Sequence, residues 1–299
     1  EMQRSLVGSE MCIRDRDMSS SLLRLMKSRA KRVIVGGDPN QSIYDTMPNG
    51  GPTASQDEMK QILTPKTAEL TILHRLNKFI IRSINSFMPQ MRMLAEKSSM
   101  LKKHKPAYVW HCIDHTDEVN RIMGDAKTAL NFGESVAILL PAHWKIENFV
   151  NIYLQSIGKP TFDFSQDRQY GKPNYGLLNQ HLENHGVKMQ CITNGFGSLV
   201  TDSDKITLST YHSSKGLDFD KVFMPFCNQG NGNEDDPRLF MVAMSRSRKD
   251  LTLSYTTNMN RFIQQFFNNR EACQFIDFKD MDKGPNIFGN NNTSDEEDD

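Results

Sequence analysis

The sequence predicts an α/β fold with a doubly wound parallel sheet, because short apolar runs alternate with amphipathic helical stretches. Each run is brief and bounded by glycine, proline or polar residues, which is typical of a strand buried on both faces. Apolar residues recur with helical spacing within residues 76–87, 119–130 and 146–157. The expected strands are residues 32–35, 69–73, 136–140, 206–210, 221–226 and 251–255. Of these, 136–140 and 206–210 are expected to lie side by side.

The composition is that of an ordinary globular protein, with 37% hydrophobic and 24% charged residues among 299. No apolar run approaches the roughly 20 residues that a membrane-spanning helix needs, so no membrane partner is expected. The five cysteines lie far apart and form no CxxC pair, which predicts free thiols in a reducing compartment and no metal site. We therefore expect an intracellular protein, cytoplasmic and nucleoid-associated, or in the host cytoplasm if the source is a phage or virus.

Charge is unevenly distributed although the formal net charge is zero. The last five residues are all acidic, so the rest of the chain is mildly basic. A basic cluster can displace counterions from nucleic-acid phosphates, although a solvated loop has the same composition. The basic residues that crowd one stretch are Lys97, Lys102, Lys103, His104 and Lys105. The tail from about residue 284, rich in Asn, Gly and acidic residues, is expected to be disordered.

The first candidate site is the segment GDPNQSIY, which follows the expected strand at 32–35. A Gly-Asp turn there presents Gln41 and Tyr44 at the carboxyl edge of the sheet, where α/β proteins bind ligands. The Gln41 amide can donate to a phosphate oxygen and accept from an attacking water, and the Tyr44 ring can stack on an unpaired base. The alternative interpretation is a polar turn with an ordinary surface tyrosine.

Two arginines are candidates for contacts with phosphate. Arg75 lies in the segment LHRL after an expected strand, and its guanidinium can form two parallel hydrogen bonds that lysine cannot. Arg246 ends the segment RLFMVAMSR, where a positioned arginine can neutralise charge during phosphoryl transfer. The alternatives are a surface arginine at position 75 and, at position 246, an arginine that complements a helix dipole.

The longest candidate site is the loop TYHSSKGLDF, which follows another expected strand. The side chains of Thr210, His212 and Ser213 can donate hydrogen bonds to a nucleic-acid backbone. Gly216 permits close approach of the backbone to a ligand, and Asp218 can accept from a ribose hydroxyl. A Ser-His pair also occurs in hydrolases, but no nucleophile elbow accompanies this one.

In this order, the four segments resemble motifs III, IV, V and VI of the UvrD/Rep/PcrA-like superfamily I DNA helicases. The family patterns are approximately GDxxQSIY, NYRS, TxHxxKGLEF and RLxYVAxTRA, where this chain has GDPNQSIY, LHRL, TYHSSKGLDF and RLFMVAMSRS. Residues 134–164 also resemble the segment that opens the family's second RecA-like domain. The resemblance covers roughly residues 17–255.

The resemblance implies a RecA-like fold of the P-loop NTPase type, with ATP and Mg²⁺ as cofactors and with single-stranded and duplex DNA as partners. It implies catalytic roles for Gln41 and for Arg246, the latter as an arginine finger. The residues that it places near ATP are Gln41, Arg75, Lys215, Gly216, Asp218 and Arg246. The residues that it places against DNA are Tyr44, Thr210, His212 and Ser213.

The chain departs from the family patterns at four positions. Thr46 stands where a base-stacking tryptophan is usual, so one stacking platform for DNA is expected to be missing. Asp218 replaces a glutamate, which shortens its reach to ribose by one methylene. Met241 and Ser245 replace the tyrosine and threonine of the last motif.

The sequence contains no GxxxxGKS/T phosphate-binding loop and no paired carboxylates for Mg²⁺. Residues 1–16 resemble translated sequencing adapter, so authentic sequence is expected to begin near Asp17. Residues 17–73 would be the remnant of the first RecA-like domain. Residues 74–262 would be the second, with a short insertion at about 167–205, and residues 263–299 would be a C-terminal tail.

This organisation predicts a truncated chain that is inactive by itself. The complete protein is expected to be an ATP-dependent DNA helicase, in which ATP hydrolysis drives movement along DNA. The alternative is a non-catalytic pseudohelicase that binds nucleic acid or serves as a scaffold.

Overall fold

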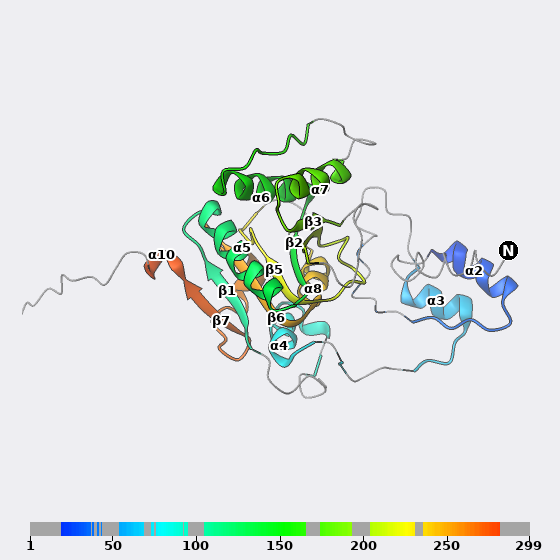
Figure 1. Ribbon diagram of the computed structural model, residues 1–299. Coiled ribbons are helices and arrows are strands. Elements are labelled where there is room, and N and C mark those ends of the chain that lie inside the picture. Colours follow the sequence, from blue (N-terminus) through cyan, green and yellow to red (C-terminus); the bar gives the residue numbers. More distant parts are fainter. Residues whose placement is uncertain are drawn as a thin grey trace, which may run out of the picture.

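A seven-stranded sheet forms the centre of the molecule, and all of its paired strands run parallel (Figure 1). The computed structural model describes residues 19–36, 38, 41, 43, 54–68, 73–74, 76–91, 93–94, 105–165, 174–192, 204–230 and 236–281. The strand order across the sheet is β3-β4-β2-β5-β6-β1-β7. The strands are β1 (Ala107–His111), β2 (Val136–Leu140), β3 (Met189–Cys191), β4 (Ile206–Thr210), β5 (Phe219–Met224), β6 (Ser247–Tyr255) and β7 (Cys273–Asp277). The predicted α/β class with a parallel sheet is confirmed.

Two interior strands, β2 and β4, lie side by side as the sequence predicts. Ala137 pairs with Thr207 and Leu140 with Thr210, in parallel register. Both strands are buried along their whole length, which explains why they appear in the sequence as continuous apolar runs. The strands expected at 221–226 and 251–255 are β5 and β6, which begin earlier, at Phe219 and Ser247.

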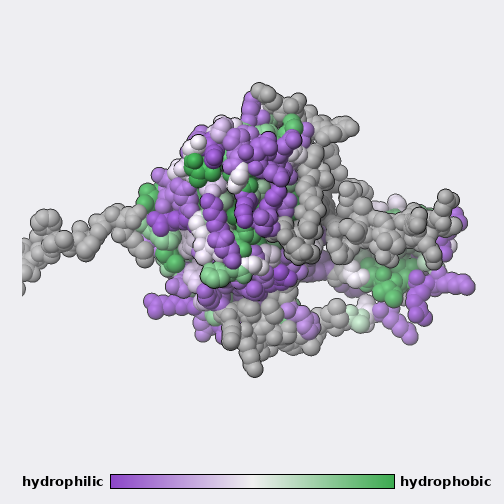
Figure 2. All heavy atoms as spheres, viewed as in Figure 1, coloured by the Kyte–Doolittle hydropathy of each residue, from purple (hydrophilic) through white to green (hydrophobic). Residues whose placement is uncertain are grey.

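Helices cover both faces of the sheet, and successive residues of a strand therefore belong to different cores. In β2, Ile138 faces the core formed with α5 (His115–Asn131), α6 (His143–Ser156) and α7 (Tyr175–Asn184). Its neighbour Leu139 faces the core formed with α4 (Lys78–Phe87), α8 (Pro237–Met244) and α9 (Arg261–Gln264). The helical stripes predicted at 76–87, 119–130 and 146–157 correspond to α4, α5 and α6. Hydrophilic residues dominate the outward side of the α5 and α6 layer (Figure 2).

Local capping signals fix where these helices begin. Asp114 accepts a hydrogen bond from Asp117 N at the start of α5, and Asn77 caps α4 in the same way. Asp236 caps α8, whose first residue is Pro237, a residue suited to the first helical turn. The start of α6 differs, because its N-cap residue is Ala142, which makes no side-chain capping bond.

The amino-terminal part of the described chain contains a helix pair and no strand. α2 (Ser20–Arg29) and α3 (Gln56–Leu63) pack together around Leu23, Ala54 and Ile62. The strand expected at 32–35 was a wrong prediction: these residues are not in a strand, and the Ile34 side chain is 86% exposed. The apolar run is present, but among the described residues no strand pairs with it to supply ladder hydrogen bonds.

The sheet extends beyond residue 262, where we expected the domain to end. β7 pairs with β1, and Phe266 and Ala272 are buried in the connection that leads to it. α10 (Phe278–Met281) then follows directly, and the 3-10 helix η2 (Pro89–Met91) lies after α4. Within the segment 167–205, α7 and the edge strand β3 add to the fold instead of forming a separate excursion. Residues 1–16 and 284–299 lie outside the described residues, as do 69–72 of the strand expected at 69–73.

In the described part of the chain, no helix is both long and apolar enough to traverse a bilayer. The four described cysteines (Cys112, Cys191, Cys227 and Cys273) are buried and form no disulfide with one another. Burial raises the pKa of the Cys112 and Cys191 thiols well above the ordinary range, so these two behave as small apolar core residues.

Candidate functional site

The loop between β4 and β5, residues 211–218, runs from the carboxyl ends of the strands to their amino ends. These two sides of the sheet are called the carboxyl edge and the amino edge. At its start, Thr210 is paired with Leu140 at the carboxyl end of β2. At its end, β5 enters the sheet with Lys221 paired with Val136, the first residue of β2. The hydroxyl-bearing end of the loop therefore lies at the carboxyl edge, and the Gly216–Asp218 end lies at the amino edge.

The hydroxyl end of the loop is held by an internal turn. The Thr210 hydroxyl donates to Ser213 Oγ over 2.9 Å and accepts from Ser213 N over 3.1 Å. Thr210 is only 4% exposed, whereas His212 and Ser213 are half-buried. Of the three predicted DNA contacts in this loop, His212 and Ser213 are thus the more accessible. Thr210 fixes the turn that presents them.

Burial lowers the pKa of His212 from its ordinary value of 6.5, and the nearby Asp236 carboxylate opposes this shift. A lowered pKa means that the unfolded chain binds the proton more readily, so stability is lost as pH falls through the unfolded value near 6.5. We expect thermal unfolding of His212→Asn to show a smaller loss of Tm than wild type between neutral pH and mild acid. Equal losses in both proteins would contradict the buried environment of this imidazole.

The other end of the loop meets the first candidate segment. Lys215 Nζ donates to the backbone oxygen of Gln41 over 2.7 Å, a contact between residues far apart in sequence. The Gln41 side chain donates to Asp38 Oδ2 over 2.9 Å, which holds the turn closed. Gly216 follows with φ of +90°, a conformation that costs glycine little and other residues much. The structure thus brings Gln41, Lys215 and Gly216 together.

Arg246, which follows α8, contacts the same end of the loop. Its side chain is 1% exposed and is among the largest of the fully buried side chains. Nε donates to Val242 O over 2.9 Å, Nη2 to Ser245 Oγ over 2.8 Å and Nη1 to Leu217 O over 3.3 Å. The guanidinium therefore ties the end of α8 to the loop. Its contact with Val242 O in the last turn of α8 agrees with the helix-dipole alternative, and its contact with Leu217 O adds a link to the loop.

The remaining predicted site residues are not all placed. Tyr44 and Arg75 lie outside the described residues, and so does the basic cluster apart from Lys105, which is exposed. Asp218 is described and exposed, at the amino-edge end of the loop. Among the residues that the structure describes, no three His, Cys, Asp or Glu side chains converge as a metal site would require.

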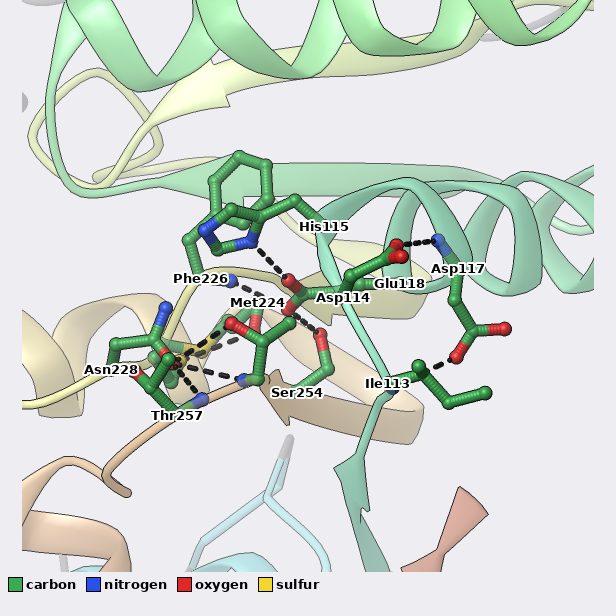
Figure 3. Close-up of polar contacts among 12 residues, drawn as sticks. Ile113, Asp114, His115, Asp117, Glu118, Met224, Phe226, Asn228, Ser254 and Thr257 are labelled. Carbon is green, nitrogen blue, oxygen red and sulfur yellow. Dashed lines mark hydrogen bonds and ion pairs between the residues drawn. The ribbon is translucent and has the colours of Figure 1, made fainter. Parts of the chain in front are cut away.

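A second group of polar residues, which the sequence did not single out, lies where the first turn of α5 meets the carboxyl ends of β5 and β6 (Figure 3). Glu118 is fully buried, and its Oε1 accepts from Phe226 N over 2.8 Å and from Ser254 Oγ over 2.6 Å. Its Oε2 lies 3.1 Å from His115 Nδ1. Above this network is a cavity of about 310 Å³, lined among others by Trp144 and Lys145. An aromatic-basic pair just after the end of a buried strand is the sequence signal that could have revealed it.

Comparisons with known protein sequences give two matches. Residues 164–258 match the family model of the UvrD-like helicase C-terminal domain. The chain is 35% identical over 74 residues to the ATP-dependent DNA helicase Rep of Buchnera aphidicola subsp. Schizaphis graminum (strain Sg). That match spans 21% of this chain and 11% of the relative, so the chain represents only a small part of that protein's length.

A comparison with solved structures finds the C-terminal domain of a possible DNA helicase from Lactobacillus plantarum WCFS1. The sequences are 14% identical, the TM-score is 0.43, and the match covers 68% of this chain and 98% of that one.

Proposed function

We propose that this chain, which carries a UvrD-like helicase C-terminal domain over residues 164–258, is the second motor domain of an ATP-dependent DNA helicase. The observation that supports this most is the way the loop 211–218 is held. Its amino-edge end contacts Gln41 through Lys215 and Arg246 through Leu217, and its other end carries Thr210, His212 and Ser213. A ligand that displaces Gln41 or Arg246 would therefore move the groups expected to face DNA.

The hydrogen-bond donors and acceptors at the amino-edge end of the loop 211–218 fit a nucleotide. ATP, when bound, supplies a γ-phosphate whose charge changes during hydrolysis. The Lys215 ammonium and the Arg246 guanidinium can stabilise that charge, and the Gln41 amide can orient a water. Gly216 permits close approach, and Asp218 can accept from the ribose. We assign no Mg²⁺ ligand to the described residues.

Arg246 must change one contact to reach a phosphate. Its longest hydrogen bond, from Nη1 to Leu217 O at 3.3 Å, is the one that links it to the loop. Exchange of that bond for a phosphate oxygen would release Leu217 while Nε and Nη2 keep the guanidinium anchored to α8. We infer that, through this exchange, binding or release of ATP changes the position of the loop residues that are expected to face DNA.

At the carboxyl edge, the expected partner is the sugar-phosphate backbone of single-stranded DNA. Hydroxyl and imidazole donors contact a backbone without distinguishing bases. Contacts of this kind suit a protein that moves along a strand of any sequence. Binding through phosphates is expected to weaken as salt rises, because it depends on counterion release.

The test compares this chain with a protein in which a first motor domain with a phosphate-binding loop precedes it, taken from the upstream reading frame. The chain of residues 1–299 is expected to show no measurable ATPase or unwinding, because affinity for ATP in such folds comes mainly from the phosphate-binding loop and Mg²⁺. The longer protein is expected to hydrolyse ATP faster when single-stranded DNA is added. The measurement is phosphate release with and without an oligonucleotide.

Three outcomes would contradict this proposal. One is ATP hydrolysis by residues 1–299 alone. Another is hydrolysis by the longer protein without any stimulation by DNA. An upstream frame that encodes no phosphate-binding loop would favour a pseudohelicase, which binds nucleic acid without turnover.

A further inference from the structure

The sheet ends in two edge strands, β3 and β7, and each has an outer side that faces away from the rest of the sheet (Figure 1). On β3, Ile192 N donates to Leu208 O, so the backbone groups of the preceding Cys191 point outward. A side chain of α7 binds both of these groups. Asn179 Nδ2 donates to Cys191 O over 3.0 Å, and Asn179 Oδ1 accepts from Cys191 N over 2.6 Å. This amide takes the place of a further strand and blocks that edge.

The backbone of β7 points the N–H and C=O of Phe275 to its outer side. Cys112 N donates to Tyr255 O of β6, and the backbone groups of successive strand residues point in opposite directions. Those of Val109, three residues before Cys112, therefore point to β7. Val109 is aligned with Phe275, and aligned residues of parallel strands point their backbone groups in the same direction. The groups of Phe275 consequently point away from β1, and no strand among the described residues pairs with that side.

The side chains of β7 leave its outer side accessible. Phe275 is 39% exposed, even though its ring centroid lies 6.1 Å from that of Phe267, and Gln274 is exposed as well. The five residues of β7, CQFID, include no lysine or proline, and the strand pairs with β1 without a register shift. Lysine, proline and bulges are the usual protections of an edge strand. β7 therefore remains able to pair with another strand.

The two ends of β7 carry opposite charge. The start has two basic residues and one acidic residue, and the end has two acidic residues and one basic residue. These residues are Arg82, Arg270 and Glu271 at the start, and Asp277, Lys279 and Asp280 at the end. An antiparallel copy of β7 would place the positive start of each strand beside the negative end of the other. The surface is thus complementary to itself, as an interface around a two-fold axis requires.

We propose that the outer side of β7 pairs with β7 of a second copy of this chain, antiparallel and with Phe275 opposite Phe275 of the partner subunit. Residues that lie opposite each other and point their backbone groups at each other exchange both hydrogen bonds in an antiparallel ladder. The two Phe275 residues would do so. Asp277 N would donate to Cys273 O of the partner subunit, because residues two apart point the same way. The inference goes beyond the proposed helicase function and does not depend on it.

The expected dimer is weak, because one pair of short strands buries less than the roughly 1,200 Å² of a stable interface. Sedimentation equilibrium of residues 1–299 would be measured over a range of loading concentrations. The average mass should rise from one chain at about 10 μM toward two chains at about 500 μM, and should not exceed two.

Two variants at the centre of the pairing test its register. Phe275→Lys and Phe275→Glu each place like charges directly opposite each other across the two-fold axis. Each should therefore raise the dissociation constant of the dimer at least about tenfold. An equimolar mixture of the two variants should associate again, because lysine then faces glutamate. This recovery requires that residue 275 of one subunit lies opposite residue 275 of the other.

A backbone variant and a matched control complete the test. Phe275→Pro removes an N–H that points away from β1, so it should abolish association and leave the sheet folded. Gln274→Lys adds a charge to the neighbouring exposed residue. In the proposed register residue 274 lies opposite Ile276 of the partner subunit, so no like charges meet and association should persist. Thermal unfolding would verify that every variant folds.

Several outcomes would overturn the pairing of β7 with itself. Masses of one chain up to about 500 μM would show that the copies do not associate. Association that persists in Phe275→Lys would assign it to another surface, and a mixture of the two charged variants that stays monomeric would exclude this register. Masses well above two chains would indicate open aggregation. None of these results bears on DNA-stimulated ATP hydrolysis, which tests the proposed function separately.

Discussion

Replacement of Arg246 by alanine, in a protein that carries both motor domains, is expected to lower the rate of ATP turnover by about 10³-fold or more. An arginine that neutralises charge in the transition state affects turnover much more than ground-state binding. Single-strand binding should remain close to wild type, because the groups that we propose to face DNA, His212 and Ser213, lie at the carboxyl ends of the strands, opposite Arg246. The measurements are DNA-stimulated phosphate release and anisotropy of a labelled strand.

Because Arg246 is buried, its replacement removes packing as well as charge, and a control must separate the two effects. Alanine would leave Val242 O, Leu217 O and Ser245 Oγ without these donors, so some loss of thermal stability is expected as well. Arg246→Met fills most of the volume without the charge, and a folded Met variant without turnover would separate chemistry from packing. Arg82→Ala, which removes an exposed ion pair with Glu271, should leave turnover unchanged. Hydrolysis that persists in Arg246→Ala would show that this residue only supports the fold.

Four interior strands, β2, β4, β5 and β6, were predicted from the sequence, whereas the interior strand β1 and the two edge strands, β3 and β7, were not. β2 and β4 are buried throughout, and their bounds agree with the predicted ranges. β3 has only three residues. β7 lies at the other edge, and Gln274 and Phe275 in it are exposed. An edge strand needs only one apolar face and one partner, so its sequence lacks the continuous apolar run that identifies a central strand.

The run at residues 32–35 illustrates the opposite error. Its composition satisfies the pattern of a buried strand, yet the described residues form no ladder there. Hydrophobic pattern reports what a segment can bury, whereas a strand also requires a neighbour with unpaired backbone groups. Sequence alone could not supply that second condition.

For the candidate site as well, the sequence predicted some features and not others. Motif spacing selected Gln41, Lys215 and Arg246 as candidates. Lys215 follows β4 and Arg246 follows α8, whereas the apolar run before Gln41 is not a strand. The contact between Lys215 and Gln41 was not predictable, since it joins distant segments through the tertiary fold. Glu118 was missed for a related reason: it lies beside the apolar stripe of α5, and its partners Phe226 and Ser254 are more than a hundred positions away.

Replacement of Glu118 by alanine is expected to lower the free energy of unfolding by about 3 kcal/mol. The carboxylate is fully buried, so its loss would leave Phe226 N and Ser254 Oγ without their acceptor and open a cavity at the carboxyl ends of β5 and β6. Phe226 would also lose the hydrogen bond that compensates for its positive φ. The measurement is urea unfolding of residues 1–299 at neutral pH, followed by circular dichroism.

A graded series would test whether the hydrogen bonds or the charge of Glu118 matter more. Glu118→Gln retains a carbonyl oxygen for Phe226 N and Ser254 Oγ, so it should destabilise less than Glu118→Ala. Glu271→Ala, at a carboxylate that is 75% exposed in a surface ion pair, should change the free energy of unfolding by less than about 1 kcal/mol. If Glu118→Ala proved no more destabilising than Glu271→Ala, the buried network would not hold Phe226 in place. The cavity wall would then owe its conformation to the packing of His115 and Phe149 against the Phe226 ring.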